Sequence, residues 1–317
     1  MPFTNPGVLE VYKRDRENQK RIHGASTRER TKVGGGLVPL CLVFLCTILL
    51  IGNTLNRIYV DMAIEQIKRE GINYEYFREM LIPIDEVNSP AIIDNTENIN
   101  SKNKNPFDQY DYLALHILLK QNGYAGAFSI LPSNQTRLLK KMYQNTSFQE
   151  LKGYLQAILE DVKKFPIDYA LMKKEEVTYI DSWNYLRSYG GKRKHEGTDL
   201  MSTENVPDRI EVVSMTDGTV EKMGWLEKGG YRIGIRGSKG AYYYYAHLSS
   251  YAPQVQIGDT VKAGDLLGLM GDSGYGVEGT TGMFPVHLHV GIYVETPYGE
   301  RSVNPYLILK MIENTEK

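Results

Sequence analysis

The sequence predicts a mainly antiparallel β domain that follows an α-helical segment and one transmembrane helix. Three observations predict this order. An uncharged, apolar stretch lies near the start of the 317-residue chain, and apolar residues then recur at helical spacing. After about residue 166, glycines become frequent and short runs alternate apolar with polar residues. The formal net charge of −1 gives no sign of a nucleic-acid-binding surface, so we expect no nucleic-acid partner.

The apolar stretch extends from Val33 to Asn56 and contains no charged residue. Its centre, residues 37–54, is just long enough to cross a hydrocarbon layer as a helix, which takes about 20 residues. The alternative is a cleaved secretory signal, which needs a short basic leader and a small-x-small cleavage site. Here the leader covers residues 1–36 and no such site follows the stretch, so we expect an uncleaved membrane anchor.

The charges on either side of the stretch predict its orientation. The leader contains eight Lys or Arg residues and four acidic residues, whereas the charges just after the stretch are balanced. By the positive-inside rule, the leader stays in the cytoplasm and the rest of the chain lies outside the cell membrane. The chain has two cysteines, Cys41 and Cys46, and both lie in the predicted span. The outer part is therefore expected to contain neither a disulfide nor a thiolate metal ligand.

Helical patterns predict how the chain is organised before the β domain. The predicted parts are a juxtamembrane helical segment (55–93), an Asn-rich linker (94–106) and a second helical segment (107–165). In the second segment, one helix is expected to end at Gly123 and another to cover Phe148 to Phe165. His116 lies among leucines in the first of these helices, so we predict a packed structural histidine and not a metal ligand.

The predicted β domain covers residues 166–317. Its alternating runs include Tyr242–His247 and Pro285–Val294. Asp217–Gly218 and Lys239–Gly240 have the composition of hairpin turns. No long amphipathic helix is expected before the C-terminal tail.

Four of the six histidines lie in this domain, at positions suited to metal binding. They are His195, His247, His287 and His289. On a strand, residues two apart point to the same face, so His287 and His289 share one face and Leu288 points to the core. A single His-x-His on a strand is a weak signal, but its occurrence with the other candidates in one domain is more specific.

The remaining candidates come from two other segments. His195 and Asp199 are four residues apart in a glycine-containing segment, where a turn can bring both side chains to one ion. His247 ends a tyrosine-rich run, and on a regular strand it would share a face with Tyr243 and Tyr245. A catalytic zinc ion needs three protein ligands and an open position. Five candidates for three places leave two histidines for acid–base chemistry.

The order and local sequences of these residues resemble those of the lysostaphin-type (LytM-like) zinc endopeptidases. That family is marked by a His-x-x-x-Asp element, a later Tyr-x-His-Leu segment and a final His-x-His. The resemblance implies a β fold of the duplicated-hybrid-motif, or barrel-sandwich, type. It also implies that His195, Asp199 and His289 bind one Zn2+ ion, and that His247 and His287 move the protons of the reaction.

The resemblance covers roughly residues 177–305. It makes Tyr189, six residues before the first ligand, a candidate for a phenol that stabilises an oxyanion. The glycine-rich loop 272–282 has two interpretations, a flexible surface connection or a wall of the substrate groove. Glu196 and Glu278 are expected to be exposed to solvent, because the motif already supplies histidines as general bases.

The resemblance implies a membrane-anchored metalloendopeptidase that hydrolyses amide bonds in the cross-linking peptides of peptidoglycan. The reaction would take place on the outer side of a bacterial cell membrane, during remodelling of the wall. The alternative is a latent or inactive wall-binding or scaffold module of the same fold, which acts in division or sporulation with an activator or partner. The complete set of ligand and acid–base candidates favours the enzyme.

Overall fold

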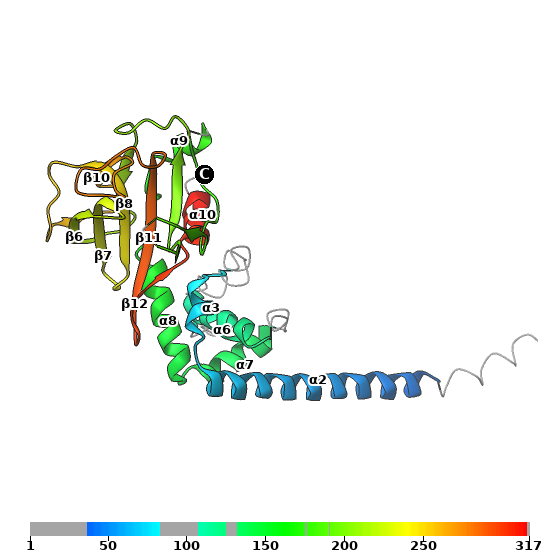
Figure 1. The fold of residues 1–317 in the computed structure, drawn as a ribbon. Coiled ribbons are helices and arrows are strands. Elements are labelled where there is room, and N and C mark those ends of the chain that lie inside the picture. Colours follow the sequence, from blue (N-terminus) through cyan, green and yellow to red (C-terminus); the bar gives the residue numbers. More distant parts are fainter. Residues whose placement is uncertain (1–36, 83–106, 125–131, 175, 190, 316–317) are drawn as a thin grey trace, which may run out of the picture. The chain divides into compact units, whose positions relative to one another are not determined.

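The computed structural model describes residues 37–82, 107–124, 132–174, 176–189 and 191–315 (Figure 1). The chain forms two compact units, Met1–Asp61 and Met62–Lys317. The predicted basic leader and the predicted Asn-rich linker lie outside the described residues.

The first long element is helix α2, which runs without interruption from Leu37 to Glu70. From Pro39 onward this helix is long enough and apolar enough to cross a membrane, with a mean hydropathy of 1.9 in its most apolar window. Side chains in this part of the helix, such as Leu40 and Phe44, are 71% and 68% exposed, so their apolar surface is not covered by other described residues. The helix ends at Gly71, whose φ of +68° is the left-handed conformation common at helix C-termini.

Four further helices precede the β domain within the described residues. They are α3 (Tyr74–Arg78), α6 (Gln109–Gln121), α7 (Pro132–Met142) and α8 (Thr146–Leu159). Helix α6 begins with a capping box, in which Asp108 and Asp111 each accept a hydrogen bond from the other's backbone N–H. Asp111 is buried and pairs with Lys152 of α8 at 2.8 Å. This pair gives the buried carboxylate of α6 the partner that it requires.

Helix α8 ends at Leu159, six residues before its predicted end at Phe165. Beyond the helix, Val162 forms an isolated β-bridge with Thr216, and the backbone N–H of Lys163 donates to the carbonyl of Met215 at 2.8 Å. The prediction was wrong because a strand-like contact with a segment far along the chain replaces the last helical turns.

The β domain contains twelve strands and two helices among the described residues. The strands are β1 (Val177–Thr178), β2 (Leu186–Arg187), β3 (Arg193–Lys194), β4 (Thr198–Ser202), β5 (Glu211–Val213), β6 (Gly218–Leu226), β7 (Gly230–Gly237), β8 (Tyr242–Tyr251), β9 (Thr260–Val261), β10 (Leu266–Met270), β11 (His287–Thr296) and β12 (Gly299–Val303). The helices are α9 (Tyr169–Lys173) and α10 (Tyr306–Thr315). Helix α10 is the amphipathic helix predicted for the C-terminal tail.

Ten of these strands form one sheet, and β2 and β3 form a separate pair. The main order is β1-β4-β11-β8-β7-β6-β9, with β10 paired to β5 and β8 and β12 paired to β11. Figure 1 labels β11, β8, β7 and β6 of this order. Every strand pair is antiparallel. The predicted fold class, a mainly antiparallel β domain after a helical segment, is confirmed.

One of the two predicted hairpin turns is confirmed and the other is wrong. Lys239–Gly240 connects the paired strands β7 and β8, and Gly240 has a φ of +101°. Asp217–Gly218 connects β5 and β6, which do not pair with each other. Asp217 instead accepts a hydrogen bond from the backbone N–H of Ala263 at 2.9 Å and pairs with Lys163 at 2.8 Å. Its side chain therefore fastens this connection to neighbouring loops.

The central strands have one face in the core. In β11, Leu288, Val290 and Ile292 are completely buried. In β8, Tyr243 and Tyr245 are also completely buried, and the hydroxyl of Tyr243 donates to the carbonyl of Ile158 at 2.8 Å. The opposite face of β11 carries His287 and His289.

Candidate functional site

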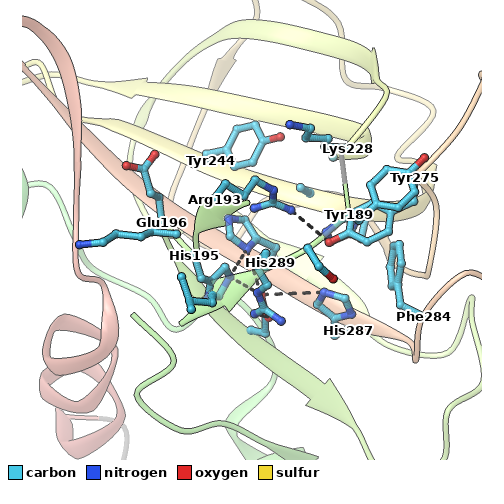
Figure 2. Close-up of a pocket in the computed structure, with 18 of the residues that line it drawn as sticks. Tyr189, Arg193, His195, Glu196, Lys228, Tyr244, Tyr275, Phe284, His287 and His289 are labelled. Carbon is cyan, nitrogen blue, oxygen red and sulfur yellow. Dashed lines mark hydrogen bonds and ion pairs between the residues drawn. The ribbon is translucent and has the colours of Figure 1, made fainter. Parts of the chain in front are cut away.

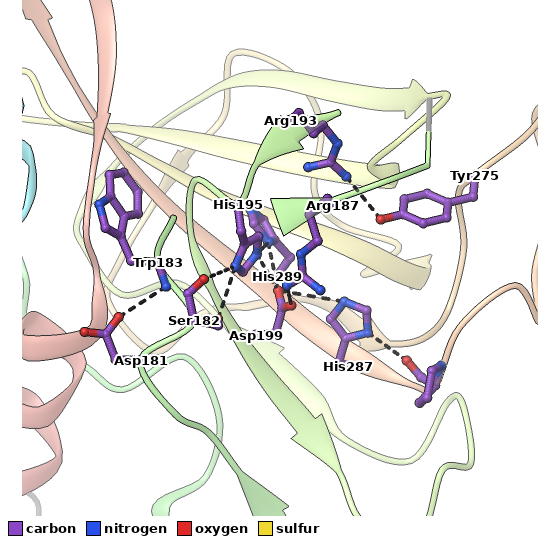
Figure 3. A network of polar contacts seen from close by, with 11 residues as sticks. Asp181, Ser182, Trp183, Arg187, Arg193, His195, Asp199, Tyr275, His287 and His289 are labelled. Carbon is purple, nitrogen blue, oxygen red and sulfur yellow. Dashed lines mark hydrogen bonds and ion pairs between the residues drawn. The ribbon is translucent and has the colours of Figure 1, made fainter. Parts of the chain in front are cut away.

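The three predicted metal ligands meet on neighbouring strands. Asp199 of β4 and His289 of β11 are directly opposite each other in the strand register, and His195 lies between β3 and β4. Nε2 of His195 lies 3.0 Å from Oδ1 of Asp199 and 3.0 Å from Nδ1 of His289. Nδ1 of His289 lies 2.9 Å from the same Asp199 oxygen (Figure 3). The three side chains form a cluster that could hold a metal ion.

The geometry and chemistry of this cluster fit a single zinc ion. Two imidazole nitrogens and one carboxylate oxygen are a ligand set typical of catalytic zinc. Zinc–ligand distances of about 2.0–2.1 Å in a tetrahedral site place the ligand atoms ~3.3 Å apart, close to the separations observed here. Nδ1 of His195 donates to the carbonyl of Ser182 at 3.0 Å, which leaves Nε2 directed at the cluster.

The carboxylate of Asp199 is held in place through both of its oxygens. Burial would raise the pKa of Asp199, but the imidazoles of His195 and His289 beside its carboxylate hold that pKa well below its usual range. Nη2 of Arg187 donates to Oδ2 at 2.5 Å, whereas Oδ1 faces the histidines. Arg187 thus orients a ligand, and nothing in the sequence indicated this role, because it lies on the two-residue strand β2 outside any motif.

Gly197 is a second residue that the motif did not single out. It lies between the ligands His195 and Asp199. A Cβ atom at this position would lie 2.4 Å from Cε1 of His289 and 2.6 Å from the carbonyl oxygen of Val290. Only glycine lets the segment approach β11 this closely.

His247 and His287 lie side by side next to the ligand cluster, with ring centroids 4.7 Å apart. Nδ1 of His247 donates to the carbonyl of Ser273 at 2.8 Å, and Nδ1 of His287 donates to that of Pro285 at 2.7 Å. Nε2 of His287 lies 3.9 Å from Oδ1 of Asp199. Burial lowers the pKa of both histidines, so both rings are neutral near pH 7 and can accept a proton.

The predicted face of His247 was wrong. On a regular strand it would share a face with Tyr243 and Tyr245, which are buried in the core. His247 instead lines the same pocket as Tyr244. The pairing of β8 with β7 shifts register at this point, and His247 has a φ of +65°. This β-bulge inserts a residue and turns the histidine to the opposite face.

A pocket of about 700 Å³ surrounds these five residues. An aromatic wall borders it, in which Tyr189 stacks on Tyr275 with ring centroids 4.0 Å apart and an interplanar angle of 5° (Figure 2). Phe284 continues this wall, with its ring centroid 4.6 Å from that of His247. Loop 272–282 thus contributes Tyr275 to the pocket wall. The role of Tyr189 in stabilising an oxyanion stays a prediction.

Three other polar residues that the sequence singled out lie outside the ligand cluster. Glu196 borders the pocket, is half exposed and pairs with Arg78 of α3 at 2.7 Å. Glu278 is exposed. His116 is buried in α6, and burial lowers its pKa to about 4.

The comparison with known proteins agrees with this geometry. The profile of peptidase family M23 matches residues 193–305. A crystal structure from Ruminococcus gnavus ATCC 29149, provisionally named a glycyl-glycine endopeptidase LytM, is 42% identical with a TM-score of 0.59. That match covers 78% of this chain and 95% of the other. The chain belongs to peptidase family M23. The share matched exceeds residues 166–317, so the likeness extends beyond the M23 domain into the preceding segment.

Two curated relatives are similar to the M23 domain. An L-Ala–D-Glu endopeptidase of Bacillus subtilis (strain 168) is 41% identical over 143 residues, which are 45% of this chain and 43% of the relative. The glycyl-glycine endopeptidase ALE-1 of Staphylococcus capitis is 33% identical over 106 residues, which are 30% of this chain and 28% of the relative. The chain therefore spans less than half the length of either relative, and the similarity concerns the peptidase domain.

Proposed function

We propose that this chain is a zinc endopeptidase that hydrolyses amide bonds in peptidoglycan peptides. One observation carries the proposal. The side chains of His195, Asp199 and His289 converge to within 3.0 Å of one another, beside two oriented histidines in the pocket of an M23 domain. The 41%-identical relative is named for cleavage between L-Ala and D-Glu, which makes this bond the first candidate substrate.

The chain's own residues supply orientation and proton transfer. A bound zinc ion would polarise the peptide carbonyl and make water acidic enough to attack near neutral pH. The unprotonated Nε2 atoms of His247 and His287 are positioned to take a proton from the attacking water and return it to the departing amine. Their Nδ1–H groups donate to backbone carbonyls, which holds the rings in place and stabilises the charged imidazolium. The phenol of Tyr189 would donate to the developing oxyanion.

The alternative, an inactive wall-binding or scaffold module, has less support. A scaffold would not require three convergent ligands and two neutral histidines in one pocket. It would also have no use for the Arg187 hydrogen bond that orients Asp199.

We further propose that α2 anchors the chain in the cell membrane, with the leader in the cytoplasm and the M23 domain outside. The length and apolar surface of α2 support the anchor, and the basic leader supports the orientation. This arrangement places the pocket on the side where peptidoglycan lies.

Ligand and acid–base variants test the proposed reaction. We expect Asp199→Asn and His289→Ala to lose both zinc and activity, because each removes one of three ligands. We expect His247→Ala to keep zinc and to lose about 10²- to 10⁴-fold in kcat, because it removes only proton transfer. The measurements are the zinc content per chain and mass spectrometry of digested muropeptides.

Glu278→Gln is the matched control, since it changes an exposed acidic residue outside the ligand cluster, and it should retain zinc and activity. Normal digestion by His289→Ala would overturn the assignment.

A further inference from the structure

Arg193 is a cation in the pocket wall that has no acidic partner among the described residues. It lies on β3, two residues before the ligand His195, and its side chain lines the same pocket. Nη2 donates to the hydroxyl of Tyr275 at 3.1 Å (Figure 2). Nε is buried and has no hydrogen-bond partner in the part of the chain that the structure describes. A partly buried guanidinium without an acidic partner is costly, so the part of this group that lines the pocket is suited to an anion that arrives from outside the chain.

The acidic residues of the pocket do not compensate this charge. Glu196 is paired with Arg78, and Asp199 is occupied by the histidines and Arg187. Two further cations, Lys194 and Lys228, also line the pocket, are exposed and form no ion pair within the described residues. The pocket therefore has an excess of positive charge outside the ligand cluster, and this charge attracts an anionic group.

Arg193 is held in a way that suits recognition of a carboxylate. Its anchor Tyr275 is itself stacked on Tyr189, so the guanidinium is attached to a rigid wall. A pre-oriented guanidinium loses little conformational entropy when it binds, and its planar donors match the two oxygens of a carboxylate. The exposed lysines, in contrast, are suited to steering an anion toward the pocket.

We propose that Arg193 binds a free carboxylate of the substrate peptide, next to the bond that is cut, and so determines the substrate class. The inference rests on the proposed function and makes it more specific. Peptides with an acidic residue at the cleavage site are preferred over peptides in which the same residue is amidated or replaced by glycine. The carboxylate gives the guanidinium of Arg193 the anionic partner that the described residues do not supply.

The test uses two L-Ala–D-Glu-containing peptides that differ only in one group, the free carboxylate of the D-Glu residue or the corresponding carboxamide. Binding of each to the zinc-free full chain in detergent is measured by isothermal titration calorimetry, where no hydrolysis interferes. The kcat/KM of each is then measured with the zinc-loaded chain. The wild type should prefer the carboxylate peptide about 10- to 100-fold in both measurements, as expected for hydrogen bonds to a charged group.

Arg193→Gln should remove this preference by weakening binding of the carboxylate peptide, with the affinity for the carboxamide peptide and the zinc content unchanged. Arg193→Lys, which keeps the charge without the planar fork, should retain only part of the preference and provides a second variant if the first folds poorly. The matched control is Lys192→Gln, which removes the same charge from the adjacent exposed residue outside the pocket lining. It should keep the full preference.

The proposal is overturned if the wild type binds both peptides equally, or if Arg193→Gln keeps the full preference. Failure of the proposed function is a separate result. If the zinc-loaded chain cuts neither peptide while the zinc-free chain still prefers the carboxylate in an Arg193-dependent manner, carboxylate recognition is supported and hydrolysis of this bond is not.

Discussion

At the scale of single residues, the ligand cluster leaves no room for a side chain at Gly197. The added methyl group of Gly197→Ala would lie 2.4 Å from the ring of His289 and 2.6 Å from the backbone of β11. The ring must shift, and so we expect zinc affinity to fall about 10- to 100-fold. Overpacking should also lower the free energy of unfolding by about 1–3 kcal/mol. A competition titration with a zinc indicator and urea unfolding measure the two effects.

Gly153→Ala is the matched control, because this glycine lies in helix α8 and, among the described residues, no atom beyond its chain neighbours and its own helix backbone lies within 4 Å of the added group. It should leave zinc affinity unchanged and stabilise the chain by up to about 1 kcal/mol. Unchanged zinc affinity in Gly197→Ala would show that His289 does not bind zinc in the position described.

The sequence alone predicted that the ligand candidates share one site, because the direction of each side chain follows from local rules. Strand periodicity placed His287 and His289 on one face, and a short glycine-containing segment joined His195 to Asp199. Arg187 and the carbonyl of Ser182 could not be predicted. Both contact the ligands through the irregular segment before β4, where no periodic pattern specifies which side chains meet.

At the scale of elements, the buried face of α6 makes the helical segment sensitive to pH. His116 is 1% exposed, and burial lowers its pKa to about 4, below the usual 6.5. The unfolded chain therefore binds a proton more readily than the folded chain, and stability present above pH 6.5 is lost as the pH falls toward 4. We expect the free energy of unfolding to fall by about 2 kcal/mol between pH 7.5 and pH 5.0 from this residue alone.

Urea unfolding at the two pH values measures this effect. His116→Leu removes the titrating group and should have a smaller pH dependence by the same amount. An identical pH dependence in the two proteins would show that His116 takes up no additional proton on unfolding.

Element boundaries were predictable only where local sequence decides them. The end of α6 near Gly123 follows from a helix-terminating glycine. The end of α8 does not, since apolar spacing continues to Val162, which pairs with Thr216 instead. The bulge at His247 depends on how β8 pairs with β7, and such a register cannot be deduced from one strand.

At the scale of the whole molecule, the proposed topology gives a direct test. If α2 is an uncleaved anchor, the full chain should remain in the membrane fraction after washing with alkaline carbonate, because the apolar helix lies in lipid. Protease added to intact spheroplasts should remove the M23 domain, while an epitope at the N-terminus should stay protected. Digestion of the epitope in intact spheroplasts would contradict the cytoplasmic location of the leader.

The order of the apolar helix, the helical segment and the β domain along the chain was predictable. An uncharged apolar stretch is followed by apolar residues at helical spacing and then by a glycine-rich part with alternating residues. The order of strands within the sheet was not. Strand β4 lies beside β11, and β8 lies between β11 and β7. Alternation within a strand indicates which face is buried, but it does not specify the partner strand.

The pairing of β4 with β11 also determines when the three candidate metal ligands can meet. Asp199 and His289 are opposite each other in the sheet but 90 residues apart in the chain. During synthesis, His195 and Asp199 leave the ribosome long before β11 has been made. Because all three side chains are needed, a nascent chain cannot form the complete cluster until β11 has been made. A nascent chain that stops before β11 therefore lacks the cluster, however much of the preceding sheet has folded.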